Sequence, residues 1–432
     1  ACGADAPDDL EALLHACGAA EARGLLRALD GHMVPPGPSG APTRGRADVL
    51  PTGRNLFSMD PRAIPTRSAV VLAQRAADLL MEGHLQDEGD HLSSIVIDLW
   101  GSSSLRTGGE DLALALLLMG VRPVWDNGSG RVRGIEVIPM AVLDRPRVDV
   151  TLRISGLFRD AFAGQIALFE RAVQAIADRD EDPALNPLAH GVRGLTGEAR
   201  LRATARIFGA APGCYGTGIE DMLARDGWDG RDALGHAWLA GSAWTYGGLR
   251  EGARDDDALH RRIAAADILL HVQDHAEIDI LESADIAAHA GGMAAAAAAL
   301  GQTPRVLHGD TSRPETPRLR ATAQEVARVV RGRLTNPAWL AGMRRHGYRG
   351  AAEIARGVAA LHAFAATVPA RFDRQFDLAF AAIVNDAEMD RFLATANPDA
   401  RAAIHHRMAQ AQRQGLWRPH SNSAAMLLDP DT

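Results

Sequence analysis

The sequence predicts an α/β protein with a parallel-sheet core, a loop-rich middle region and an all-helical C-terminal region. Residues 94–100 and 268–272 are continuous apolar runs rich in β-branched side chains, which is typical of strands buried on both faces. Helical and strand periodicities alternate around these runs, as in βαβ units. From residue 337 to residue 416 the periodicity is helical throughout.

The first half of the chain supplies several elements of this fold. Residues 8–31 have the leucine spacing of one amphipathic helix, which ends at Gly31. Residues 34–55 are rich in proline and glycine, so we expect no regular structure there. The elements that follow are a helix over 66–82, a buried strand over 94–100, a loop over 101–109, a helix over 110–119, strands over 121–125 and 131–138 around an Asn127-Gly128 hairpin motif, a strand over 148–154 and a helix over 158–178.

The second half begins with a segment of loops and short helices, residues 195–248. Beyond it we expect a buried strand over 268–272, a helix over 283–300, a short strand over 305–308 and a helix over 316–331. Four regions result: an N-terminal helix and Pro/Gly/Arg loop (1–66), an α/β domain (67–195), a second α/β region (196–335) and a helical C-terminal region (336–432).

Composition excludes several classes of function. All 46 basic residues are arginine. Without lysine the chain has no P-loop of the Walker type, no Schiff-base amine and no kinase strand lysine. A net charge of −8 argues against a dedicated nucleic-acid binder. No apolar run approaches the roughly 20 residues that a membrane-spanning helix needs.

The expected cellular location of the protein is inferred from its cysteines and its first residues. The three cysteines form no CxxC pair, which argues against a disulfide framework and a thiolate zinc site. The first residues are acidic and resemble neither a signal peptide nor a transit peptide. We therefore expect a cytoplasmic protein with no membrane span.

The proline-rich loop and the end of the first strand carry candidate anion-binding groups. Arg44, Arg46 and Arg54 lie in the loop with few acidic neighbours, which favours an anion-facing role over that of a linker. Arg106 lies among hydroxyls and glycines at residues 101–109, a pattern that suits an anion near a helix N-terminus. The alternative there is structural, because the acids at residues 110 and 111 would stabilise the helix dipole.

Residues 271–289 are dense in groups that bind divalent metal ions. Eight of these 19 positions are Asp, Glu or His, and they follow a buried strand. Oxygen and imidazole ligands suit hard or borderline divalent ions. The alternative is a solvated loop that leads into an acidic helix start. The candidate metal ligands are His271, Asp274, Glu277, Asp279 and His289.

A glycine-rich segment, residues 213–218, is a third candidate. Three glycines in six residues permit close approach of the backbone to a ligand. Gly213, Tyr215 and Gly216 are the candidate substrate contacts.

Motifs along most of the chain resemble one family. They include RTGGEDLA (106–113), GVRPVW (120–125), RPRVDVTLRISGLFRD (145–160), PGCYGTGIE (212–220), DILESAD (279–285), TNPAWLAGMRRHGYRGAAEI (335–354) and GLWRPHSNS (415–423). In order and content they resemble the large subunits of aerobic cobaltochelatases, and more loosely those of magnesium chelatases. The family's large subunits are much longer, so the chain resembles their C-terminal portion.

The resemblance implies ATP-dependent insertion of cobalt(II) into hydrogenobyrinic acid a,c-diamide in cobalamin biosynthesis. It implies that this chain binds the corrinoid tetrapyrrole, while an AAA+ ATPase subunit hydrolyses ATP with Mg and an integrin-I-like subunit assists. A separate N-terminal large-subunit portion is a further possible partner. Two alternatives stay open: a magnesium chelatase acting on protoporphyrin, and a non-catalytic tetrapyrrole-binding fragment.

The predicted site joins these candidates. If the strands over 94–100 and 268–272 share one sheet, the loops after them converge on one crevice. Where the family has Asn-Arg-Glu-His-Asp, this chain has His275-Ala-Glu-Ile-Asp279, so we expect carboxylates to act ahead of histidines. Glu110 and Glu277 are the predicted essential groups. Clustered carboxylates should raise at least one pKa, and the metal site should be open and completed by water.

Overall fold

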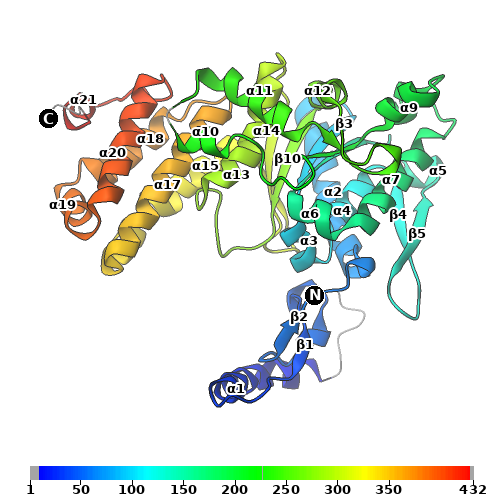
Figure 1. Cartoon of the computed structure of the whole chain (residues 1–432), viewed down its shortest axis with the longest axis horizontal. Helices are drawn as coiled ribbons and strands as arrows, with labels where there is room; N and C mark the ends of the chain where they lie inside the picture. Colours follow the sequence, from blue (N-terminus) through cyan, green and yellow to red (C-terminus); the bar gives the residue numbers. More distant parts are fainter. Residues whose placement is uncertain (1–8, 226, 429–432) are drawn as a thin grey trace.

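The computed structural model describes residues 9–225 and 227–428. Its core is an eight-stranded sheet with the order β12-β11-β10-β3-β6-β7-β8-β9. Figure 1 shows two of its strands, β3 and β10, in the middle of the body among the helices. Five neighbouring strands are parallel, and β12, β8 and β9 extend the edges in antiparallel fashion. The strands are β3 (Ser94–Leu99), β6 (Asp149–Ile154), β7 (Ile207–Gly209), β8 (Trp244–Thr245), β9 (Ala253–Arg254), β10 (Ile268–Gln273), β11 (Arg305–Asp310) and β12 (Arg318–Ala321). The predicted α/β class with a parallel-sheet core is confirmed.

Strand β3 shows why the centre of the sheet forms. Ile95 and Ile97 point into one apolar core, and Val96 points into the core on the opposite face. Successive side chains of a strand alternate between faces, so a continuous apolar run requires helices on both sides. One core contains α2 (Arg67–Glu88), α4 (Glu110–Leu118) and α7 (Ala163–Ala177); the other contains α11 (Gly230–Ser242), α14 (Gly292–Ala299) and α17 (Gly347–Thr367).

The remaining elements surround this core. The predicted hairpin is present as β4 (Val121–Trp125) and β5 (Val132–Val137). The C-terminal region is helical as expected. The other helices are α5 (Met140–Leu143), α8 (Pro187–Val192), α9 (Gly197–Thr204), α10 (Glu220–Ala224), α12 (Asp256–Ala264), α13 (Ala284–Ile286), α16 (Pro337–Arg345), α18 (Asp373–Ala379), α19 (Ala387–Ala396), α20 (Pro398–Arg413) and α21 (Ser423–Leu427). No described helix has the length and apolarity to cross a bilayer.

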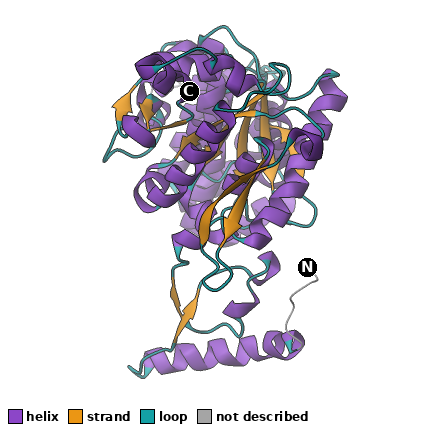
Figure 2. Ribbon diagram, turned by 90° about the vertical axis from the view of Figure 1, so that its right-hand side faces the viewer, coloured by secondary structure: helices purple, strands orange, loops and turns teal. Residues whose placement is uncertain are grey.

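The N-terminal arm, defined here as residues 10–57, extends away from this body (Figure 2). It contains α1 (Leu10–Leu29) and a two-stranded parallel pair, β1 (Pro36–Pro38) and β2 (Asn55–Phe57). The expectation of no regular structure over 34–55 is therefore wrong in part, because two short turns of 3-10 helix also lie there. Backbone pairing with β2 orders a segment whose own sequence disfavours helices and strands.

Three other predictions need correction. The predicted loop over 101–109 contains a helix, α3 (Gly101–Thr107), whose hydroxyls bond back to the carbonyls of Trp100 and Ser103. The helix predicted over 158–178 is two helices, α6 (Gly156–Ala161) and α7, with a break at Phe162. The range predicted as one helix, 316–331, instead contains strand β12 followed by helix α15 (Thr322–Val329). In the last case pairing with β11 overrides the local preference.

Candidate active site

The candidate site lies where the order of the sheet reverses. From β3 the chain continues outwards to β6 and β7, whereas β10 and β11 lie on the other side of β3. Ligands of open α/β sheets bind at such a point, beyond the carboxyl ends of the strands. Strands β3 and β10 are parallel neighbours, and His271 is in register with Asp98. The expectation that the loops after these two strands meet at one edge is confirmed.

Asp98 is the buried centre of this edge. Its carboxylate accepts a hydrogen bond from Trp100 Nε1 at 2.6 Å, and Nδ1 of His271 lies 3.1 Å from Oδ2. Because the carboxylate can only accept, the Nδ1–H of His271 donates. Burial alone would raise the pKa of Asp98, but His289, His271 and Arg153 together hold it well below its usual range.

His289 faces this carboxylate from the helical segment after β10. Its Nδ1 lies 3.2 Å from Asp98 Oδ1 and 2.9 Å from Nη1 of Arg153. Burial lowers the pKa of His289, although the neighbouring Asp98 carboxylate opposes the shift, and this favours the neutral imidazole. In the tautomer whose Nδ1–H donates to Asp98, Nε2 is left for a ligand or a proton, whereas in the tautomer whose Nδ1 accepts from Arg153, Nε2 carries the hydrogen.

A second polar cluster lies above the loop after β10. Arg106, on α3, donates to both carboxylate oxygens of Asp274, each at 2.7 Å. Arg44 reaches in from the arm, pairs with Glu110 and donates to the carbonyls of Asp274 at 2.5 Å and Thr311 at 2.7 Å. Burial raises the pKa of Glu110, although Arg44 opposes the shift. The arm is thereby fastened to the site.

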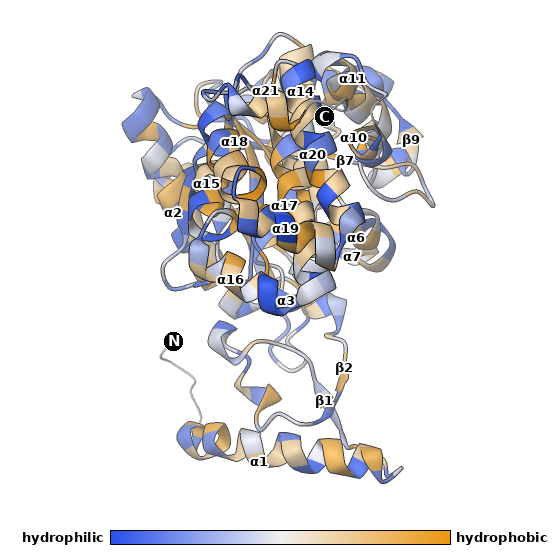
Figure 3. Cartoon of the chain, turned by 90° about the vertical axis from the view of Figure 1, so that its left-hand side faces the viewer, coloured by the Kyte–Doolittle hydropathy of each residue, from blue (hydrophilic) through white to orange (hydrophobic). Residues whose placement is uncertain are grey.

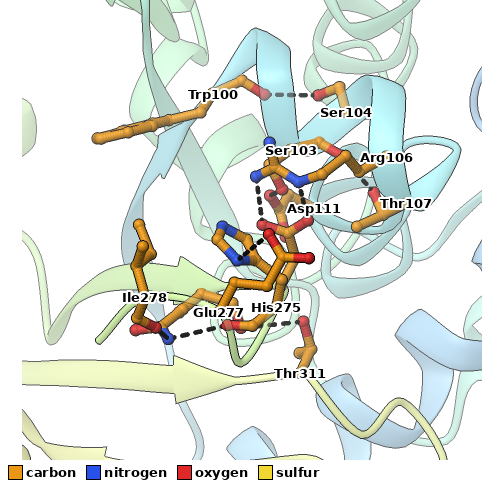
Figure 4. Close-up of polar contacts among 12 residues, drawn as sticks. Trp100, Ser103, Ser104, Arg106, Thr107, Asp111, His275, Glu277, Ile278 and Thr311 are labelled. Atoms are coloured by element: carbon orange, nitrogen blue, oxygen red, sulfur yellow. Dashed lines mark hydrogen bonds and ion pairs between the residues drawn. The ribbon is translucent and has the colours of Figure 1, made fainter. Parts of the chain in front are cut away.

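Asp111 is a buried carboxylate whose pKa is raised. It is buried, accepts a hydrogen bond from Ser103 Oγ at 3.0 Å and has no arginine in direct contact among the described residues. Burial, with the charge of Asp274 next, raises the pKa of Asp111 to about 7. Figure 4 shows Asp111 beside Arg106, with Glu277 extending from the next loop. The expected raised pKa is therefore present.

Two adjacent cavities open over these clusters. One, of about 810 Å³, is lined by Arg44, Arg106, Asp274 and Glu277, with arm residues at its rim. The other, of about 670 Å³, is lined by Trp100, Tyr215, Glu220 and His289. Ser102 and Leu157 line both, so the two cavities form one groove across the ends of the central strands.

The glycine segment shapes the second cavity. Tyr215 is 67% exposed, its ring packs on Gly156 and under the Arg159 guanidinium, and its hydroxyl donates to Asp160 at 2.6 Å. Gly216 has φ of +83°, and a Cβ there would lie 2.7 Å from Oε1 of Glu220. Glycine is thus required at residue 216, while Gly213 faces open space.

Two other predicted substrate contacts, Arg46 and Arg54, lie apart from the groove. Arg46 forms an ion pair with Asp48, and Arg54 packs against Gly37 and bonds to the carbonyl of Leu50. Arg44 is buried against protein groups. The three arginines of the predicted loop therefore do not converge on one free anion site, because each has protein partners.

The predicted metal ligands are divided among three places. His271 and His289 meet at Asp98, Asp274 is held by Arg106, and Asp279 forms an ion pair with Arg333 at 2.5 Å. Glu277 is 91% exposed at the rim of the larger cavity. Within residues 9–225 and 227–428, no three His, Cys, Asp or Glu side chains are grouped as they would be around a metal ion.

Comparison with known proteins identifies the family. The model of the CobN/magnesium chelatase family matches residues 4–424. The chain belongs to this family. It is 48% identical over 94% of its length to the aerobic cobaltochelatase subunit CobN of Pseudomonas aeruginosa, and 46% identical over 94% to that of a Sinorhizobium species. A magnesium-chelatase subunit from Chlorobaculum parvum is 31% identical over 92% of the chain.

A solved family structure has the same fold. The catalytic subunit of cobaltochelatase from Mycobacterium tuberculosis superposes with a TM-score of 0.88 at 37% identity, over 97% of this chain. This chain covers 36% of that protein and 33% of each of the two CobN relatives. It therefore spans about a third of the length of the relatives it matches.

Sequence reasoning missed several groups in this family member. Asp98, Trp100, Arg153, Asp111 and Glu220 all contribute to the clusters or line the groove. The sequence feature that could have indicated Asp98 and Arg153 is a charged residue inside an otherwise apolar strand. Such a group is buried only with partners, and partners distant in sequence are visible only in the fold.

Proposed function

We propose that this chain is the tetrapyrrole-binding part of a chelatase large subunit that inserts cobalt(II) into hydrogenobyrinic acid a,c-diamide in cobalamin biosynthesis. The observation that carries the proposal is the groove at the sheet switch point. It combines an exposed aromatic ring at Tyr215 with the cation of Arg106. Glu110 and Asp111, whose pKa values are raised, line a separate cavity, and the ion pair of Glu110 with Arg44 connects them to the groove. Membership of the family supports the same conclusion.

The groups on the groove have complementary roles in this proposal. The macrocycle rests on Tyr215, and its carboxylates approach Arg106, which is 45% exposed and can share its donors. Insertion requires the ring nitrogens to lose their protons and the ion to lose bound water. Glu277 replaces water on the incoming ion at the rim, and Glu110 and Asp111 accept protons, since both hold protons more tightly than ordinary carboxylates.

The two histidines have a place in the same scheme. Asp98 fixes His271 and His289 at the floor of the groove, and His289 lines the smaller cavity. A neutral imidazole there serves as a transient ligand or proton acceptor. Asp274 orients Arg106, and Asp279 acts indirectly by anchoring the loop through Arg333.

ATP hydrolysis belongs to partners in this proposal. The chain has no lysine for a P-loop, so an AAA+ subunit with Mg hydrolyses ATP and an integrin-I-like subunit transmits the motion. A separate N-terminal large-subunit portion completes the complex where one is encoded. A cytoplasmic location, expected from the few cysteines, is part of the same proposal.

A magnesium chelatase acting on protoporphyrin is the second candidate. The 48% and 46% identities to cobaltochelatase subunits, against 31% to a magnesium-chelatase subunit, favour cobalt. Arg106, which is 45% exposed and lines the larger cavity, also suits a ring with many carboxylates.

The test is metal insertion by the complex reconstituted with both partner subunits and ATP. Cobalt(II) with hydrogenobyrinic acid a,c-diamide is compared with Mg²⁺ and protoporphyrin, and the product is followed by absorbance. We expect turnover with the first pair only. Turnover with Mg²⁺ and protoporphyrin alone would show that the chain belongs to a magnesium chelatase. Tight tetrapyrrole binding without turnover in either assay would identify a non-catalytic binding module.

A further inference from the structure

The N-terminal arm carries an apolar surface that the described residues leave uncovered. Figure 3 shows hydrophobic segments along α1, which lies below the body and contributes only Gly24 to the buried residues. Seven of the 19 exposed large hydrophobic side chains in the described ranges belong to the arm: Leu14, Leu25, Leu26, Leu29, Met33, Leu56 and Phe57. Leu29 and Met33 are each 74% exposed. An apolar concentration of this kind marks an interaction surface.

Helix α1 already packs on the rest of the arm with its other side. A Cβ at Gly24 would lie 2.5 Å from the carbonyl oxygen of Gly53, and Thr52 Oγ1 donates to Glu21 at 2.5 Å. Leu13 and Ala20 are half-buried on the same side. This inner face fixes the orientation of α1 relative to the rest of the arm.

The outer face is a separate stripe. Leu14, Gly18, Ala22, Leu25 and Leu29 follow one another at intervals of three and four residues, and every one is exposed. Such intervals place side chains on one side of a helix, where they can pack against a second helix. Gly18 and Ala22 in the middle of the stripe allow a close approach. A helix that is apolar on two faces needs a partner on both.

We propose that this outer stripe is the surface on which the rest of a chelatase large subunit packs. The CobN relatives are about three times as long as the matched region, which is 33% of their length, so about two thirds of each relative lies outside this region and is available to pack on it. The arm extends from the body and offers the densest exposed apolar surface described. Arm residues Ser39, Gly40 and Ala41 also line the larger cavity, so the packed portion would lie beside its mouth.

Thiol labelling tests the proposal without any activity measurement. Leu25→Cys and Leu29→Cys are made in this chain and at the aligned positions of the whole Pseudomonas aeruginosa subunit, and Leu249→Cys, at a position 87% exposed, is the matched control. A water-soluble maleimide is applied, and each peptide is quantified by mass spectrometry. We expect similar rates for all three in this chain. In the whole subunit the two α1 cysteines should react at least tenfold more slowly, with the control unchanged.

Two results would overturn the proposal. Equal labelling rates in the chain and in the whole subunit would show that nothing in the large subunit covers the stripe. Protection that appears in this chain alone and grows with its concentration would assign the stripe to a second copy. As a second measurement, Leu25→Ser with Leu29→Ser should lower the melting temperature of the whole subunit by several degrees and leave that of this chain unchanged. The proposed metal insertion can fail independently of these outcomes.

Discussion

Asp98 and His289 meet in the floor of the groove although 191 positions separate them in the chain, with Oδ1 of the carboxylate 3.2 Å from Nδ1 of the imidazole. Asp98 also accepts hydrogen bonds from Trp100 and His271, and Nη1 of Arg153 lies 3.6 Å from Oδ1 of Asp98. One carboxylate therefore orders two imidazoles and neutralises a buried guanidinium. The side chain of Asp98 has no exposed surface, so water cannot replace the carboxylate as the hydrogen-bond partner of these groups.

Asp98→Asn should destabilise the fold strongly. The change leaves Arg153 buried without its carboxylate, and breaking a buried charge pair costs about 3–5 kcal/mol. Asp48→Asn is the control, because Asp48 is 55% exposed and its ion pair with Arg46 should contribute less than about 1 kcal/mol. Urea unfolding at pH 7 measures both. A loss for Asp98→Asn no larger than that of the control would contradict the assigned role.

Asp111 should make the stability of the protein depend on pH. Its pKa is raised to about 7 in the fold, above its ordinary value of 3.8, so the folded state binds more protons between these limits. The contribution of Asp111 is therefore fully present below pH 4 and is lost as the pH rises through 7, and each tenfold difference in proton affinity corresponds to about 1.4 kcal/mol. Asp111→Asn should remove this component. Unfolding free energies measured at several pH values should show the wild type losing stability relative to the variant as pH rises; a constant difference would contradict the raised pKa.

Arg44 and Glu110 should behave as one unit in a double-mutant cycle. Arg44→Met leaves a buried carboxylate unpaired and should cost about 3–5 kcal/mol in the free energy of unfolding. Combining it with Glu110→Gln should recover part of this loss, with a coupling energy of about 0.5–3 kcal/mol. Arg46→Met, which disturbs only a partly exposed pair, is the control. Simple additivity of the two changes would show that the pair is not coupled.

Glu277→Gln should reduce cobalt insertion in the reconstituted complex at least tenfold without affecting folding. Its side chain is 91% exposed, so stability should change by no more than about 0.5 kcal/mol. Tetrapyrrole binding should be largely retained, because Arg106 and Tyr215 are untouched. Glu315→Gln removes an exposed charge outside the groove and is the control. An insertion rate equal to that of wild type would exclude Glu277 from the reaction.

The local sequence was sufficient to predict the central strands of the fold. The β-branched runs that became β3 and β10 could form only buried strands, and the convergence of their loops follows from the geometry of parallel sheets. Helix α3 was missed because Gly101 and the serines after it are weak helix formers. Its stability comes instead from packing, since Gly101 lies close against α6.

The site was less accessible to prediction because its contacts are distant in sequence. Residues 274–277 of the dense acidic and histidine segment after β10 line the larger cavity, but the other side chains of the segment have different partners. Asp279 meets Arg333, and Asp274 meets Arg106 across 168 positions. Which carboxylate stays ionised and which holds a proton depends on these pairings and on burial, and neither is encoded in local spacing.

Arg44 couples the position of the arm to the proton affinity of Glu110. Its backbone belongs to the arm, while its guanidinium compensates Glu110 and bridges the carbonyls of Asp274 and Thr311. Releasing the arm leaves Glu110 without a cation, and a proton on Glu110 loosens the hold on the arm. Thermodynamic reciprocity requires the two effects to be equal. A protein that binds the arm therefore alters the proton affinity of Glu110 by the same free energy with which a proton on Glu110 alters the binding of the arm.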